Sequence, residues 1–183
     1  GEVWVKAGSY TETIEGYPSV HVYGGFAGSE SQRSSRDYSS QTTTINGYSS
    51  DSVPVVSFVG RGEHMRIDGF TIANAVRNSH THEGNGGGIF CYFSSPTVAN
   101  NRIYNNHADG QGGGIYVENG NPVITANTIE GNSATTFGGG IYGTEAPSLI
   151  AGYNTIAENS AATDGGGIYL KNSGGSIHTS VIA

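Results

Sequence analysis

The string Gly-Gly-Gly-Ile-Phe occupies residues 86–90, and Gly-Gly-Gly-Ile-Tyr recurs at 112–116, 138–142 and 165–169. The first glycines of the four strings are 26, 26 and 27 residues apart. A repeat of this length is typical of a solenoid, in which each repeat buries its apolar face only against its neighbours. The four strings therefore predict the architecture of the chain.

Further signals recur between the glycine strings. The pattern Asn-x-Ile-x-x-Asn begins at Asn101, Asn127 and Asn154. Short β-rich runs separated by Gly, Asn and Pro indicate strands and turns rather than helices. About 26 residues for three short strands correspond to one coil of a parallel β-solenoid, so the 183-residue chain predicts about seven coils. The first asparagine of each pattern would form an amide ladder at a bend.

Side-chain parity separates two columns in the strings, because successive side chains of a strand point to opposite faces. The apolar column should face the core; its members are Ile89, Ile115, Ile141 and Ile168. The aromatic column should face solvent; its members are Phe90, Tyr116, Tyr142 and Tyr169, with Tyr92 beside them. We expect these rings to bind ligand by stacking on sugars. The alternative is that the rings only stack on one another and shield the sheet.

Acidic residues and histidines gather in the loops before the first two strings. Glu83 and Asp109 each lie three residues before the first glycine of a string, so register would place them on adjacent coils. Three imidazoles lie nearby, those of His80, His82 and His107. Such a cluster could hold a divalent metal such as calcium, or the carboxylate pair could serve a retaining glycosidase. Alternatively, the loops differ in length, the register fails and the groups lie in water.

The irregular stretches outside the repeat carry weaker signals. The polar stretch 28–41 lacks periodicity and is predicted to be a loop that leaves the coil. Asp68 has no partner at a matching offset in the repeat. It is therefore predicted to be a turn residue that bonds the local backbone.

Several motifs resemble the pectin-lyase-like right-handed parallel β-helix superfamily, in particular its secreted surface proteins. These motifs are VWVKAGSY at 3–10, YGGFAGSE at 23–30 and IDGFTI at 67–72. The glycine strings are similar to repeats of polymorphic outer-membrane proteins. The resemblance covers nearly the whole chain and implies an all-β, right-handed, single-stranded parallel β-helix. Polysaccharide lyases and glycoside hydrolases share this fold, so it also implies that an enzyme must be considered.

Composition limits the partners. The net charge of −7 and only 8 lysines and arginines argue against nucleic acid, and no apolar run reaches the ~18 residues needed for membrane insertion. We expect a single domain over residues 1–183, with irregular coils at 1–85 and regular repeats at 86–183. We also expect this domain to be part of a longer extracellular or cell-surface protein.

The predicted function is that of a non-catalytic structural or adhesive module. Its predicted partner is a polysaccharide or cell-surface glycan bound by the aromatic column. Uncapped strand edges at the ends are expected because the domain is part of that longer protein; the alternative is end-to-end self-association into fibres. The alternative is a carbohydrate-active enzyme. The outward row offers only Glu118 and Lys171 as catalytic candidates, and these two residues lie two coils apart, too far for joint catalysis.

Overall fold

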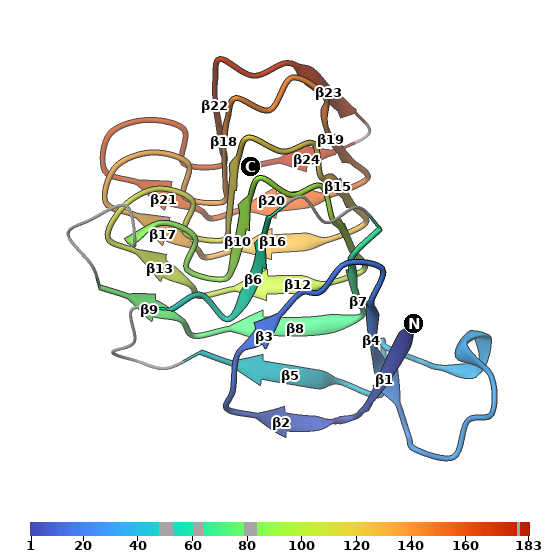
Figure 1. Cartoon of the computed structure of the whole chain (residues 1–183). Helices are drawn as coiled ribbons and strands as arrows, with labels where there is room; N and C mark the ends of the chain where they lie inside the picture. Colours follow the sequence, from blue (N-terminus) through green and yellow to red (C-terminus); the bar gives the residue numbers. More distant parts are fainter. Residues whose placement is uncertain (48–52, 61–63, 79–83, 179) are drawn as a thin grey trace.

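The computed structural model of the protein describes residues 1–47, 53–60, 64–78, 84–178 and 180–183. Within these residues the chain winds through four sheets, which we name A to D, and successive coils stack on one another (Figure 1). Each regular coil passes through sheets A, B, D and C in that order. No helix in the described part of the chain is long and apolar enough to cross a bilayer.

The strands are short, and each sheet collects one strand from each contributing coil. Sheet A contains β1 (Glu2–Lys6), β4 (His21–Phe26), β7 (Arg66–Asp68), β11 (Thr97–Ala99), β15 (Val123–Thr125), β19 (Leu149–Gly152) and β23 (Gly175–His178). Sheet B contains β2 (Gly8–Tyr10), β5 (Thr43–Asn46), β8 (Phe70–Ala73), β12 (Arg102–Tyr104), β16 (Thr128–Glu130), β20 (Thr155–Ala157) and β24 (Val181–Ile182). Sheet C contains β3 (Ile14–Glu15), β6 (Val56–Val59), β10 (Ile89–Tyr92), β14 (Ile115–Glu118), β18 (Ile141–Thr144) and β22 (Ile168–Lys171). Sheet D contains β9 (Val76–Arg77), β13 (His107–Ala108), β17 (Ser133–Ala134) and β21 (Ser160–Ala161). One turn of 3-10 helix, η1 (Arg33–Ser35), lies between β4 and β5.

The predicted all-β parallel solenoid is confirmed. Among the described residues, sheets A and B hold seven strands each, sheet C six and sheet D four, so only part of the expected seven coils is complete. The glycine strings stack in register, so that Ile89 pairs with Ile115, and Ile115 with Ile141. The repeat contains one strand more than expected, because the segment after the second asparagine forms the two-residue strands of sheet D.

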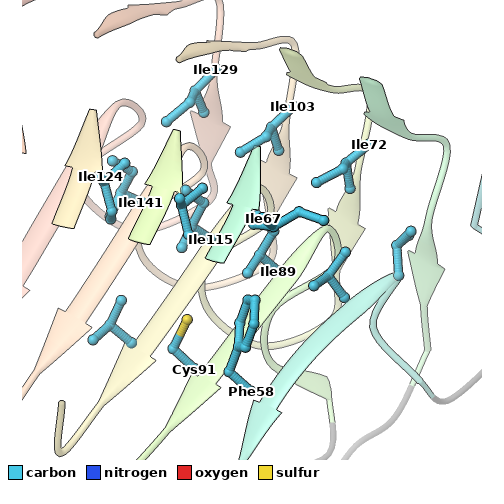
Figure 2. Packing of buried hydrophobic residues seen from close by; sticks show 14 of the residues in the cluster. Phe58, Ile67, Ile72, Ile89, Cys91, Ile103, Ile115, Ile124, Ile129 and Ile141 are labelled. Atoms are coloured by element: carbon cyan, nitrogen blue, oxygen red, sulfur yellow. The ribbon is translucent and has the colours of Figure 1, made fainter. Parts of the chain in front are cut away.

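The isoleucines of the strings fill the interior of the coils. Ile89, Ile115 and Ile141 have no exposed surface, and Figure 2 shows them in the same apolar cluster as Ile103 and Ile129 of sheet B. Complete burial of such a side chain contributes about 1.5–3 kcal/mol. The inward direction predicted for this column is therefore confirmed.

Two columns of buried asparagines hold neighbouring coils together. In the predicted column, the Asn127 side chain accepts the backbone N–H of Asn101 at 2.9 Å and donates to the side-chain oxygen of Asn154 at 3.0 Å. The second asparagine of each pattern forms an equivalent column; its members are Asn106, Asn132 and Asn159. These bonds satisfy polar groups in an interior where an unpaired one costs about 1–3 kcal/mol.

Four columns of residues in the left-handed backbone region mark the corners of the coils. They are Gly69, Asn100, Ala126 and Tyr153 between sheets A and B; Asn74, Asn105, Gly131 and Glu158 between B and D; Gly86, Gly112, Gly138 and Gly165 before C; and Phe93, Asn119, Glu145 and Asn172 after C. Only the column before sheet C consists entirely of glycine, the residue that adopts this conformation without steric cost. The other three columns contain Asn, Ala, Tyr, Glu or Phe as well as glycine.

Candidate functional site

The predicted aromatic column exists as a stack of nearly parallel rings. The ring centroids of Phe90 and Tyr116 lie 5.3 Å apart, those of Tyr116 and Tyr142 5.3 Å apart, and those of Tyr142 and Tyr169 5.7 Å apart. The angles between successive planes are 4°, 5° and 3°. Ring pairs of this kind stabilise neighbouring strands by about 0.5–1.5 kcal/mol beyond the area they bury.

The prediction that this column faces solvent is wrong for its two central rings. Tyr116 and Tyr142 are each only 3 % exposed. The chain that leaves sheet D forms a loop that turns back before it enters sheet C (Figure 1). Phe137, in one such segment, lies with its ring centroid 4.6 Å from that of Tyr169, and the Arg77 guanidinium carbon lies 5.1 Å from the Phe90 centroid. Parity predicts the side of a sheet on which a ring lies, but not what covers it.

The polar ends of the covered rings are satisfied within the protein. The Tyr116 hydroxyl donates to Glu118 Oε2 at 2.5 Å. Burial, together with this carboxylate, raises the pKa of Tyr116, and burial also raises the pKa of Tyr142. Tyr92, at the edge of the column, is 36 % exposed and packs edge-on against Phe93. Of the predicted ligand-binding rings, Tyr92 is therefore the most accessible.

The predicted loop cluster is described only in part. His80, His82 and Glu83 lie outside the described residues. His107 and Asp109 do meet, with His107 Nε2 3.2 Å from Asp109 Oδ1. No group of three His, Cys, Asp or Glu side chains among the described residues is arranged to hold a metal ion.

A serine on the next coil extends this pair into a Ser-His-Asp chain that sequence reasoning missed. Ser133 Oγ lies 2.9 Å from His107 Nδ1, because β13 and β17 place the two residues directly opposite each other. A nucleophilic serine also needs N–H donors directed at the developing oxyanion. The N–H groups of Ser133 and Thr135 instead donate to backbone carbonyls of the preceding coil. The described part of the site therefore offers a polar relay without an oxyanion hole at these two positions.

A second site, also missed, surrounds Asp68. Its carboxylate is 1 % exposed and is bound by Arg36 Nη2 at 2.5 Å, Arg66 Nε at 2.7 Å and Asn100 Nδ2 at 3.0 Å. The prediction that Asp68 is a turn residue that bonds only the local backbone is therefore wrong. Arg36 belongs to the polar loop between β4 and β5, so this ion pair fastens the loop to sheet A.

Two hollows flank this loop and share Tyr38. The first, a groove of about 470 Å³, follows the bend between sheets A and B; Tyr38, Ser39, Thr71, Asn100, Arg102 and Thr128 contribute to its lining. The second, an open hollow of about 530 Å³, is lined by Arg33, Ser34, Arg36 and Tyr38. Tyr38 is 44 % exposed and is the aromatic ring common to both. In the sequence, the only signal for these hollows is an aromatic residue inside an aperiodic polar loop.

Comparison with known proteins bears on the fold. A search of curated proteins and a search of solved structures found no match. A family profile described as right-handed beta helix region matches residues 37–183, which include all four glycine strings. Because the match extends over more than half of the chain, the protein belongs to the right-handed β-helix family.

Proposed function

We propose that this chain is a non-catalytic structural or adhesive module of an extracellular or cell-surface protein, and that it binds a glycan in the groove beside Tyr38. The observation that carries the proposal is the lining of the groove, where an exposed aromatic ring lies among hydroxyl, amide and guanidinium groups. Sugars present apolar faces that stack on such rings and hydroxyls that bond to such polar groups.

The groove is a better glycan site than the aromatic column. The two central rings of the column are covered, and a saccharide could reach them only if the covering segments moved away. Tyr38 is already exposed, and its hydroxyl lies 3.5 Å from Asn100 Oδ1 at the edge of the groove. The bend residues that line the groove are held by the asparagine columns, so the site is built on a rigid part of the fold.

The proposal is tested by glycan-array screening followed by calorimetry on the glycans that bind. Tyr38→Ala should weaken binding at least about tenfold, since it removes one stacking surface worth about 1.4 kcal/mol or more. Tyr17→Ala is the matched control, because Tyr17 is exposed and lines neither hollow. Equal affinities for the two variants would contradict the proposal.

A reducing-end assay on the bound glycans separates the module from the rival carbohydrate-active enzyme. We expect no release of new reducing ends during prolonged incubation. Release that Asp109→Asn abolishes but Ser133→Ala leaves intact would replace the proposed module with an enzyme centred on the loop cluster. Release that both substitutions abolish would point instead to the Ser-His-Asp chain.

A further inference from the structure

We propose that the C-terminal end of β10 is a docking site for an arginine side chain on a basic segment of a partner protein. The site is the aromatic corner formed by Tyr92 and Phe93, where the chain leaves sheet C. It lies at a different corner of the coil from the groove beside Tyr38, which follows the bend between sheets A and B. The inference therefore goes beyond the proposed glycan binding and is tested separately from it.

The backbone of Phe93 is unusual for so bulky a residue. Phe93 has φ = +48°, in the left-handed region that residues other than glycine seldom adopt. The neighbouring coils make the same turn with Gly60 and Asn119, which adopt this region more easily. The Phe93 ring is 41 % exposed, so burial does not explain the choice of residue either. The fold itself therefore does not require an aromatic ring at this position.

Two exposed rings and one aliphatic side chain form the surface of the aromatic corner. The ring centroids of Tyr92 and Phe93 lie 4.7 Å apart, and the ring planes meet at 87°. Phe90 supports Tyr92 from within the aromatic column, with centroids 6.1 Å apart. Val59, which is 55 % exposed, pairs with Tyr92 on the preceding coil. Arginine suits this surface, because its planar cation stacks on ring faces and its alkyl stem packs on aliphatic groups.

Carboxylates on the following coils favour a cationic occupant. Glu118 pairs with Tyr92 in register, one step of about 4.8 Å along the solenoid, and Glu145 occupies the same corner on the coil after that. Glu118 accepts the Tyr116 hydroxyl and Glu145 accepts the Asn172 amide, and both of these donors are neutral. Neither carboxylate forms an ion pair with any residue that the structure describes.

The charge of the whole chain acts in the same direction. The net charge of −7 attracts a basic partner and raises its rate of encounter. In the row that continues from Tyr92, the one cation in the described strands is Lys171, two coils beyond Glu118. A neutral or anionic occupant would cover Glu118 without supplying a counter-charge, which is unfavourable. The rings and the carboxylates together therefore specify a guanidinium group.

The first test is an NMR titration at low ionic strength with two capped glycine-serine peptides of equal length. One peptide carries two arginines, and the other carries two citrullines, the uncharged analogue of arginine. The arginine peptide should bind saturably, shift the amide resonances of Tyr92, Phe93 and Asn119, and bind at least about fivefold more tightly than the citrulline peptide. Equal affinities, or no saturable binding, would overturn the inference and leave the glycan-binding module standing.

The second test, Phe93→Asn, separates a binding role from a structural one. This change introduces the residue that the next coil uses at the same corner, so the melting temperature should stay the same or rise. The affinity for the arginine peptide should fall about fivefold or more. Tyr153→Asn is the matched control, because Tyr153 is an exposed aromatic residue with φ = +59° at a different corner, and it should leave the affinity unchanged. Unchanged affinity in Phe93→Asn, or an equal loss in both variants, would contradict the assigned site.

The third test addresses the charge. Glu145→Gln should reduce the preference for arginine over citrulline at least about twofold. Glu158→Gln removes the same charge from another exposed left-handed corner and should leave the preference unchanged. Equal preferences in the two variants would remove the charge complementarity from which the occupant was inferred.

Discussion

At the scale of single residues, one buried carboxylate joins three parts of the molecule. Asp68 lies at the end of β7, and its partners come from the loop before β5, from β7 itself and from the bend after β11. A buried carboxylate must be matched by opposite charge and hydrogen bonds, because desolvation of an ion costs several kcal/mol. The same ion pair holds Arg36, and with it the loop before β5, against sheet A.

Asp68→Asn should destabilise the protein by about 3 kcal/mol, because two guanidinium groups lose their counter-charge. This loss of stability lies at the lower end of the range for a broken buried ion pair, because the Arg66 side chain remains 30 % exposed to water. The measurement is urea-induced unfolding followed by circular dichroism. Asp164→Asn, the same change at an exposed residue, serves as control and should stay within about 0.5 kcal/mol of the wild type. Equal stability of the two variants would show that the ion pair contributes nothing.

The same carboxylate should make stability depend on pH. Burial acts to raise the pKa of Asp68, but the hydrogen bonds from Arg36, Asn100 and Arg66 outweigh it and hold this pKa below its usual value. The contribution is therefore complete above the unfolded pKa of about 3.9 and is lost as the pH falls through the lower folded value. The stability gap between the wild type and Asp68→Asn should be constant at neutral pH and shrink below about pH 4. A gap that persists unchanged in acid would rule out this linkage.

At the scale of elements, the coils that contain β14, β18 and β22 each supply an aromatic ring and the glycine-rich segment that packs beside the ring column. The glycine that opens each string makes this arrangement possible. Gly138, for example, has φ = +65°, and a Cβ there would lie 2.6 Å from the carbonyl oxygen of Ile141. Glycine at this position therefore lets the covering segment approach the strand more closely than a residue with a side chain would.

Tyr142→Ala should accordingly act on stability rather than on ligand binding. Removal of a buried ring from between Tyr116 and Tyr169 should cost about 3 kcal/mol in the free energy of unfolding. The affinity for any glycan bound in the groove should remain within about twofold of the wild type, because the groove lies along a different corner of the coil. Calorimetry and urea unfolding on the same sample check both parts. A selective loss of affinity would return the ligand site to the aromatic column.

At the scale of the whole molecule, the repeat made most of the fold predictable. Stacking in register turns an offset of 26 or 27 residues into direct contact, so the isoleucine column and the first asparagine column follow from the sequence. The contact between Arg36 and Asp68 has a separation of 32 residues and occurs once, so no internal pattern predicts it. The cover over Tyr116 depends on the path of the connecting segments, which side-chain parity does not contain.

Cys91 offers a probe of the whole molecule. It is completely buried in the core, and burial raises the pKa of its thiol, so both access and the thiolate population oppose modification. Under native conditions at pH 8, iodoacetamide should label Cys91 only at the rate at which the coils separate. Labelling should become fast and stoichiometric in urea. Rapid labelling with an unchanged circular dichroism spectrum would reveal a local opening that the packing does not predict.

The self-contained coil has a consequence for length. Residues 138–164 hold one strand for every sheet, one asparagine for each of the two columns and one covering segment. Their removal would join Phe137 to Gly165 and bring Tyr116 against Tyr169, with every column still continuous. The molecule would be shorter by one step of ~4.8 Å, while the groove would be unaltered. Gain or loss of such units therefore changes the distance between the groove and the last strand, β24, in fixed increments, without a change in the residues that line the groove.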